Sequence, residues 1–308
     1  MGKMTVVIPS FNEEDNIKNT AKVLGEVLGG AGIDYDLLFI SDGSTDNTFG
    51  LIDELSKEDE RIGGIQFSRN FGKEAAIFAG LDYATGDCVA VMDCDLQHPA
   101  ETLVEMYHLW EEGYEVVEGI KSSRGKESLL YKMFTSIFYG IMSDLMKIDM
   151  NATSDFKLLD RKVVNALLEL PEKNTFFRAL SFWVGFKSTS VQFEVKERVA
   201  GKSKWSFSGL VKYAISNTTS FTTAPLKFVF ILGVLLLAFS VILGVDTLVN
   251  YFLGIAADGF TTVILLTLIT GGSVMMSLGI IGHYIARIYE EVKGRPRYIV
   301  SKTTKQDK

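Results

Sequence analysis

The sequence predicts an α/β domain with a mostly parallel sheet, followed by two membrane-spanning helices. In the first 225 residues, short continuous apolar runs alternate with stretches of helical periodicity. That order is typical of strands buried on both faces and joined by crossover helices. After Pro225, two long segments carry no Asp, Glu, Lys or Arg. We therefore expect three divisions, an α/β domain at 1–225, a helix pair at 226–290 and a basic tail at 291–308.

Five apolar runs are expected to form strands, at 4–9, 37–41, 64–68, 88–92 and 116–119. Helices are expected between them, at 14–28, 48–57, 73–83 and 101–112. Ligands of parallel α/β sheets lie at the carboxyl ends of the strands. Four polar stretches, SFNEE, SDGSTD, SRNFGK and DCDLQHP, follow these strands and should meet at one edge of the sheet.

Two further stretches, 129–148 and 205–228, carry apolar side chains at helical spacing with little polar surface between them. Each fits either a core helix or a helix that lies on a membrane surface. The position of the second, just before the first uncharged segment, favours the membrane reading there.

The two uncharged segments, 228–245 and 259–286, are long enough to cross a bilayer, although buried core helices are the alternative. The connector between them, 246–258, has no Lys or Arg, whereas cations are frequent from residue 287 onward. By the positive-inside rule, the tail and the N-terminal domain are cytoplasmic and the connector is a short external turn. The cations of the tail are Arg287, Lys293, Arg295, Arg297, Lys302, Lys305 and Lys308.

Composition excludes several classes of protein. The chain has 31 Lys and Arg against 38 Asp and Glu, a net charge of -7, and 47% hydrophobic residues. This apolar content excludes disorder, and the acidic balance argues against a nucleic-acid binder. Cys88 and Cys94 are too few for a disulfide framework or a cysteine-rich metal site.

Asp93, Asp95 and Gln97 follow a fully apolar run, so their oxygens should share the loop beyond the end of a buried strand. Mg²⁺ and Mn²⁺ prefer such oxygens and commonly complete their shell with substrate phosphates. The pattern predicts a site that bridges a metal ion to a diphosphate, with an ordinary surface turn as the alternative.

SDGSTD also ends a strand and opens a helix, where Asp46 is expected to cap the helix. Asp42 is not needed for that cap and could accept from a base N–H or a ribose hydroxyl. Pro9 and Phe11 would then line the binding site of the base, and Glu13 would contact the ribose or the base. No Walker loop or GxGxxG fingerprint is present, which argues against kinases and dehydrogenases.

Seven stretches, in chain order, resemble the polyprenyl-phosphate hexosyltransferases of glycosyltransferase family 2. They are VVIPSFNEEDNI, ISDGSTDNT, FSRNFGKEAAIFAGLDYATGD, MDCDLQHP, SDFKLLDRKV, FFRALSFWVGF and ERVAGKSKW. The resemblance spans about residues 4–225, and the two C-terminal segments make it most similar to the bactoprenol glucosyltransferase branch. It implies a GT-A fold, a nucleotide-sugar donor, Mg²⁺ or Mn²⁺, a polyprenyl phosphate acceptor and an inverting mechanism.

The resemblance also implies roles for individual residues. Those matching nucleotide-binding positions are Pro9, Phe11, Glu13, Asp42 and Asp93, and those matching the metal and donor-diphosphate motif are Asp93, Asp95 and Gln97. Phe11 departs from the commoner tyrosine, which should spare stacking on the base. Asp155 matches the acidic residue next to the reacting sugar, as a general base or as an aligner of the acceptor phosphate.

Basic residues in an otherwise acidic chain are candidates for holding the acceptor phosphate and offsetting the charge of two phosphorylated substrates. They are Lys121, Arg124, Arg178, Arg198 and Lys202, of which Arg124 and Arg198 are also expected to support catalysis directly. Solvated surface positions are the alternative, which fits Arg124 and Arg198 least.

The expected function is inverting transfer of a hexose, with glucose the expected sugar, from a UDP-sugar to undecaprenyl phosphate at the bacterial inner membrane. Mannose and N-acetylglucosamine are alternative sugars, and a homo-oligomer is left open. A processive polysaccharide synthase would typically carry a QxxRW motif and more spanning helices, and neither is in this sequence. A membrane-tethered scaffold that binds sugar nucleotides without turnover is the alternative from outside the enzymes.

Overall fold

The computed structural model describes residues 2–122, 154–172, 176–194, 224–254 and 259–304. It separates into two compact units, one of residues 1–206 with 295–308 and the other of residues 207–294. The stretch expected at 129–148, and all of that at 205–228 before residue 224, lie outside the described residues.

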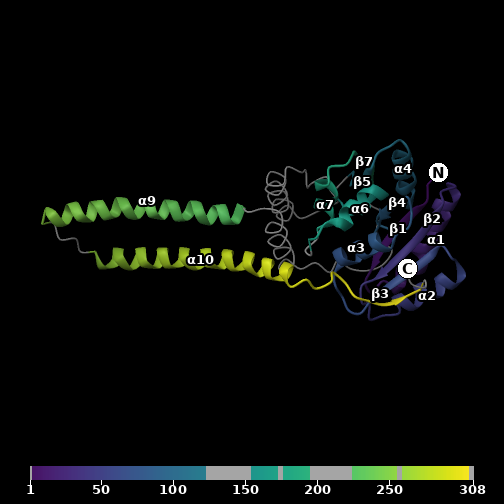
Figure 1. The fold of residues 1–308 in the computed structure, drawn as a ribbon, viewed down its shortest axis with the longest axis horizontal. Helices are drawn as coiled ribbons and strands as arrows, with labels where there is room; N and C mark the ends of the chain where they lie inside the picture. The colour runs from purple at the N-terminus through teal and green to yellow at the C-terminus, as the bar shows by residue number, and fades with distance from the viewer. Residues whose placement is uncertain (1, 123–153, 173–175, 195–223, 255–258, 305–308) are drawn as a thin grey trace. The chain divides into compact units, whose positions relative to one another are not determined.

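The first unit is built on a mixed sheet of eight described strands (Figure 1), in the order β7-β5-β6-β4-β1-β2-β3-β8. Strands β4, β1, β2 and β3 are parallel, as the sequence predicts. Two strands run against this direction, β6 between β4 and β5, and β8 beside β3. The strands are β1 (Met4–Ser10), β2 (Tyr35–Ser41), β3 (Ile62–Phe67), β4 (Cys88–Val91), β5 (Val116–Lys121), β6 (Lys157–Asp160), β7 (Ser188–Phe193) and β8 (Val300–Thr303).

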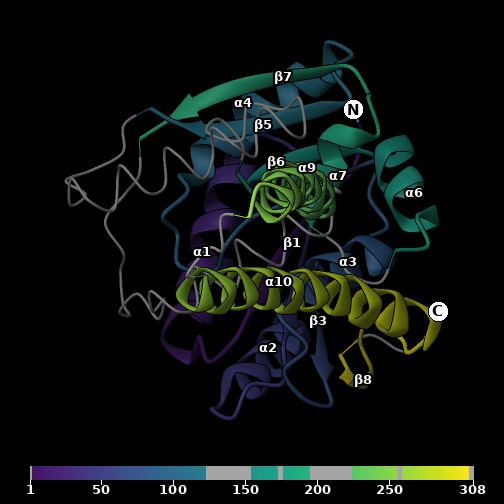
Figure 2. The ribbon, with the colours of Figure 1, turned by 90° about the vertical axis from the view of Figure 1, so that its left-hand side faces the viewer.

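Helices cover both faces of this sheet (Figure 2). Helices α1, α2 and α4 pack on one face, and α3 packs on the other with α6 and α7 beside it. The helices are α1 (Glu14–Gly30), α2 (Thr48–Glu58), α3 (Lys73–Tyr83), α4 (Ala100–Glu111), α6 (Arg161–Glu169) and α7 (Phe177–Trp183). The first four begin and end within two residues of the bounds predicted from periodicity.

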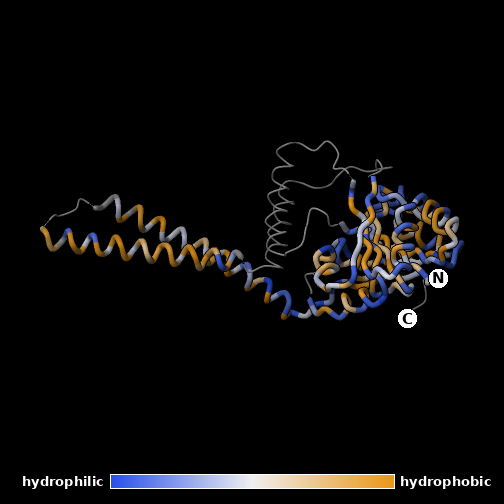
Figure 3. Tube along the Cα trace, turned by 90° about the horizontal axis from the view of Figure 1, so that it is seen from above, coloured by the Kyte–Doolittle hydropathy of each residue, from blue (hydrophilic) through white to orange (hydrophobic). Residues whose placement is uncertain are grey.

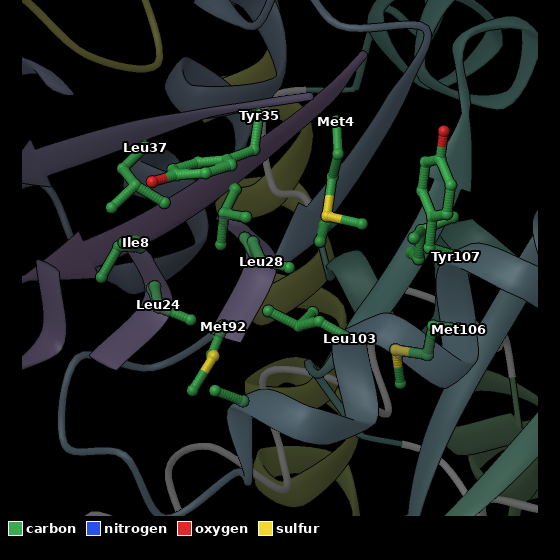
Figure 4. Packing of buried hydrophobic residues seen from close by; sticks show 14 of the residues in the cluster. Met4, Ile8, Leu24, Leu28, Tyr35, Leu37, Met92, Leu103, Met106 and Tyr107 are labelled. Atoms are coloured by element: carbon green, nitrogen blue, oxygen red, sulfur yellow. The ribbon is translucent and has the colours of Figure 1, made fainter. Parts of the chain in front are cut away.

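The core between the sheet and α1 and α4 is mostly apolar (Figure 4). Met4 and Ile8 of β1 pack with Leu24 and Leu28 of α1 and with Leu103 of α4, and all five are fully buried. Burying one such side chain stabilises the fold by roughly 1.5–3 kcal/mol. β1 is paired with β2 and β4 on either side, so the loops at the carboxyl ends of β1 and β4 leave from this buried core.

The second unit contains two long helices, α9 (Ala224–Phe252) and α10 (Phe260–Val292), which contact each other. Both are apolar over most of their length (Figure 3). The segments Pro225–Asn250 and Leu265–Val292 are long and apolar enough to cross a membrane, and their most apolar stretches are not buried within the protein. This exposure argues against the core-helix alternative. The connector is shorter than expected, because α9 continues to Phe252.

The end of the chain belongs to the first unit. The sequence suggests only a basic tail at 291–308, whereas Val300–Thr303 forms β8, antiparallel to β3. Ser68 N–H donates to the Ile299 carbonyl, and Thr304 N–H donates to the Gly64 carbonyl. The sequence gives little sign of this strand because it is four residues long and carries exposed polar side chains.

Candidate active site

The carboxyl ends of β1, β2 and β4 bring the predicted polar loops to one edge of the sheet. In the parallel register Ser10 lies opposite Ser41, and Val7 lies opposite Val91. Phe11 and Asp42 directly follow β1 and β2, and Asp93 lies two residues after the end of β4.

The antiparallel direction of β6 adds a fourth loop to this edge. Val91, the last residue of β4, pairs with Lys157 at the start of β6. Asp155, two residues before Lys157, therefore lies next to the loop that carries Asp93. A parallel strand here would have placed Asp155 at the opposite edge of the sheet.

Lys73, the first residue of α3, joins the two carboxylates. Its Nζ lies 2.5 Å from Asp93 Oδ1 and 2.9 Å from Asp155 Oδ2. Asp155 is also held by Arg178 of α7, whose Nε donates to Oδ1 at 2.6 Å and whose Nη2 donates to Oδ2 at 3.0 Å. We call Lys73, Asp93, Asp155 and Arg178 the charge network.

The network fixes the charge state of its members. Burial works against an ionised Asp155, but Lys73 and Arg178 hold the pKa of its carboxyl well below the usual range. Burial likewise opposes the ionised form of Asp93, and the Lys73 ammonium lowers the pKa of that carboxyl. Loss of hydration opposes the Lys73 cation, but Asp93 and Asp155 raise its pKa. All of these groups are charged at neutral pH.

Glu74 connects α3 to α7. Its Oε2 accepts a hydrogen bond of 2.8 Å from the Phe177 N–H, at the first residue of α7 and next to Arg178. Burial, reinforced by the negative charge of Asp155, raises the pKa of Glu74 to about 7. Glu74 therefore lies beside the charge network and changes its own charge near neutral pH.

A pH-dependent stability follows from Glu74. Because its pKa is about 7 in the folded chain against an ordinary 4.5, the native state binds the proton more tightly than the unfolded state. The free energy of unfolding should fall as pH rises from about 4.5 to about 7, and then level off. Glu74→Gln keeps an acceptor oxygen but cannot ionise, so its stability should lack this decline. Denaturant unfolding of both chains across that range checks it, and parallel curves would refute the assignment.

The predicted nucleotide side of the edge is organised around Asp42. Its buried carboxylate accepts from Phe71 N–H at 2.6 Å and from Gly72 N–H at 2.9 Å. Gly43 and Gly72 both adopt positive φ, and a Cβ on Gly43 would lie 2.2 Å from the Arg69 carbonyl carbon. Burial raises the pKa of Asp42 in spite of the two N–H donors. Asp42 thus anchors the loop that leads into Lys73, and its nucleotide contact stays a prediction.

The β1 and β2 loops are also bonded to each other. Asn12 Oδ1 accepts from Thr45 N–H at 2.9 Å, and Glu13 N–H donates to Thr48 Oγ1 at 2.9 Å. Asp46 Oδ1 accepts from Thr48 N–H at 3.1 Å, but the N-cap residue of α2 is Asn47, so Asp46 lies one residue before the cap position expected from the sequence. Phe11 remains 37% exposed at this edge, which leaves its ring accessible for stacking.

Asp93, Asp95 and Gln97 share one loop, in which Gln97 N–H donates to Asp95 Oδ1 at 3.1 Å and Leu96 has φ of 53°. Within the described residues, no group of three or more His, Cys, Asp and Glu side chains could hold a metal ion. The donor set therefore does not form an all-protein cage. It does fit Mg²⁺ or Mn²⁺ that takes one or two carboxylates and completes its shell with phosphate oxygens and water.

Of the five predicted basic residues, two lie within the described residues and three do not. Lys121 ends β5 opposite Phe193 of β7, so both strands direct the chain toward the same edge. Arg178 lies in the charge network. Arg124, Arg198 and Lys202 lie outside the described residues.

Three neighbours of the site had no role assigned from sequence, namely Lys73, Glu74 and His98. Lys73 and Glu74 open a helix directly after a strand-end loop, which is a usable signal for a ligand-facing position. His98 is buried and stacks on Phe156, the residue after Asp155, with ring centroids 4.6 Å apart. It ties the Asp93 loop to the start of β6, and a sequence pattern gives no sign of such a contact.

The family model described as "Glycosyl transferase family 2" matches residues 5–168. The "Putative glycosyltransferase CsbB" of Bacillus subtilis (strain 168) is 41% identical over 301 residues, covering 97% of this chain and 91% of the relative. The "Bactoprenol glucosyl transferase" of Shigella phage SfII is 36% identical over 307 residues, covering 98% of each chain.

Among solved structures, the chain is similar to glucosyl-3-phosphoglycerate synthase from Mycobacterium tuberculosis, in complex with Mn²⁺, UDP and phosphoglyceric acid. The TM-score is 0.51 at 18% identity, covering 70% of this chain and 75% of the synthase. At this identity the match shows a shared GT-A-like fold, which agrees with the fold expected from the sequence.

Proposed function

The chain belongs to glycosyltransferase family 2, and from this premise we propose that it transfers a hexose, with glucose the expected sugar, from a UDP-sugar to polyprenyl phosphate. The main support is its full-length similarity to a bactoprenol glucosyl transferase, together with a charge network at the edge where the donor motifs meet. Undecaprenyl phosphate is the acceptor that this similarity favours.

The reaction we propose is a single displacement. An oxygen of the acceptor phosphate attacks the anomeric carbon of the sugar. The bond from that carbon to the β-phosphate oxygen breaks, and its electron pair leaves with UDP. Attack from the face opposite the leaving group inverts the anomeric configuration.

Asp155 has a positioning role in this proposal. A carboxylate with so low a pKa is a weak base, and the acceptor phosphate is already anionic and needs little proton abstraction. Asp155 instead holds Lys73 and Arg178 at fixed places, with Arg178 in a two-pronged ion pair. Two fixed cations can offset the charge of phosphate groups that meet at one centre.

Asp93, Asp95 and Gln97 would hold Mg²⁺ or Mn²⁺ against the donor diphosphate. A divalent ion there supplies positive charge that stabilises the leaving UDP. Pro9, Phe11, Glu13 and Asp42 would bind the nucleotide. Lys121, Arg124, Arg198 and Lys202 would hold the acceptor phosphate.

The helix pair would anchor the enzyme in the bacterial inner membrane. Residues on both sides of the pair belong to the same compact unit, so the N-terminal domain and the end of the chain must lie on the same side of a membrane that α9 and α10 cross. The cations of the tail support the cytoplasmic side.

A donor panel tests the proposal. The full chain in detergent is mixed with polyprenyl phosphate, Mn²⁺ or Mg²⁺, and radiolabelled UDP-glucose, UDP-N-acetylglucosamine or GDP-mannose. We expect label from UDP-glucose to enter the lipid phase. Label from another donor would change the sugar, and binding of UDP without transfer from any donor would favour a scaffold.

The metal assignment makes a separate prediction. Asp95→Asn and Gln97→Ala should each lower turnover by roughly a hundredfold with little change in melting temperature, because the ion loses an oxygen ligand. A chelator should have the same effect. Asp34→Asn, an exposed acid just before the amino end of β2, is the matched control. Equal activity in EDTA and in excess metal would overturn the assignment.

A further inference from the structure

The segment that follows α10 is bound along the first unit as a strap, which we define as Arg295–Thr304. Its strand β8 pairs with β3 and closes that edge of the sheet (Figure 2). Tyr298 stacks on Phe67 with ring centroids 5.1 Å apart, and its hydroxyl donates to Asp82 Oδ2 at 2.9 Å. These contacts hold the strap to β3 and to the C-terminal end of α3.

Arg297 makes contacts of a different kind. Its Nε donates to the Glu172 carbonyl at 3.0 Å, and its Nη2 donates to the Leu170 carbonyl at 2.6 Å. The same guanidinium lies over the Phe78 ring of α3, 4.9 Å from the centroid. Leu170 is the C-cap of α6, and the chain from there leads to α7. Arg297 therefore contacts both α3 and the α6–α7 connection and links them.

Helix α3, and helix α7 at the end of the α6–α7 connection, carry the two cations of the charge network. Helix α3 begins at Lys73, and α7 carries Arg178. Phe78, under Arg297, meets Phe177 edge-to-face at 6.5 Å, and the Phe177 N–H is bonded to Glu74. A continuous set of contacts thus runs from the strap to the residues that hold Asp155.

We propose that Arg297 is a positioning residue, which sets the spacing of α3 and α7 and so the places of Lys73 and Arg178 around Asp155. Sheet pairing and Tyr298 already attach the strap to the domain. If Arg297 were removed, the carbonyl of exposed Glu172 could bind water, and only the half-buried Leu170 carbonyl would lose a less accessible donor. The loss of stability should therefore be small. Loss of Arg297 should instead loosen the spacing of α3 and α7. The activity readout of this proposal rests on the proposed function.

The test compares Arg297→Ala and Arg297→Lys with Arg295→Ala, an exposed arginine two residues earlier in the strap. Steady-state kinetics are measured on the full chain in detergent, with donor and acceptor varied in turn. Arg297→Ala should lower kcat about tenfold to a hundredfold, because small misplacements of reacting groups are costly. The donor KM should stay nearly constant, Arg297→Lys should recover part of the loss, and Arg295→Ala should match wild type.

Hydrogen–deuterium exchange on the same proteins without substrate gives a readout that is independent of turnover. In Arg297→Ala we expect faster exchange in peptides from 73–83 and 176–184, and unchanged exchange in β1 and β2. Unchanged exchange at α3 and α7, uniform loosening of the whole unit, or unchanged kcat would each overturn the proposal. If wild type transfers no sugar from any donor, the proposed function fails, and the exchange comparison still decides whether Arg297 couples to the site.

Discussion

Replacing Asp155 with asparagine is expected to lower the rate of sugar transfer by about 10²- to 10⁴-fold, while UDP still binds. The asparagine oxygen keeps the shape of the side chain but not the charge that holds Lys73 and Arg178. Both cations should then move relative to the bound phosphates. Steady-state transfer to polyprenyl phosphate and titration with UDP measure the two halves of this prediction.

Loss of stability has to be separated from loss of turnover. Removing one partner of a buried ion pair costs up to about 3–5 kcal/mol, and the cost should be smaller here because the Lys73 side chain is 42% exposed. Asp160→Asn is the matched control, since Asp160 caps α6 and accepts from Trp110 Nε1 outside the charge network. It should lose stability without losing turnover per folded molecule. An Asp155→Asn rate within threefold of wild type would remove Asp155 from the mechanism.

Lys73→Met should be nearly as damaging, with a loss of roughly a hundredfold in kcat. Methionine replaces the aliphatic part of the lysine side chain but leaves Asp93 and Asp155 facing each other without the shared cation. The pKa of Asp155 should rise toward its ordinary value, because the Coulombic attraction of Lys73 is lost. Kinetics over a range of pH should therefore show a new acid limb that wild type lacks.

Lys162→Met controls for the removal of a lysine from the first unit. Lys162 is 75% exposed on α6, and its Nζ lies 3.9 Å from Glu115 Oε1, a spacing at which surface pairs contribute little. Its turnover should match wild type. If Lys73→Met also matches wild type, the bridge between Asp93 and Asp155 has no part in catalysis.

The helices and strands of the first 121 residues could be predicted because the pattern of apolar and polar residues within each element shows which of its side chains are buried. Continuous apolar runs mark β1 to β4, and helical periodicity marks α1, α2 and α4, since each element packs its apolar side chains against the same core. The convergence of the polar loops at one edge follows from parallel strand direction alone. Those parts of the site required no knowledge of distant contacts.

The elements between residues 154 and 194, and β8 at the end of the chain, depend on contacts between distant parts of the chain. β6 is four residues long and begins with Lys157, which is 1% exposed and lies 2.7 Å from Glu118 Oε1 on β5. A lysine in a sequence normally indicates a surface position. The buried Lys157–Glu118 pair therefore prevents β6 from being predicted as a buried strand. The contacts of Lys73 and Arg297 could not be predicted for the same reason, because each residue has its partners far away in the sequence.

Mass spectrometry of both products of one reaction with UDP-glucose and polyprenyl phosphate tests the central claim most directly. Transfer of the hexose alone predicts UDP and a polyprenyl monophosphate hexose in equal amounts, with neither formed by Asp155→Asn at a comparable rate. UMP together with a polyprenyl diphosphate hexose would show that a sugar phosphate is transferred instead. Release of UDP with free glucose and no lipid product would show hydrolysis, and either result would contradict the account.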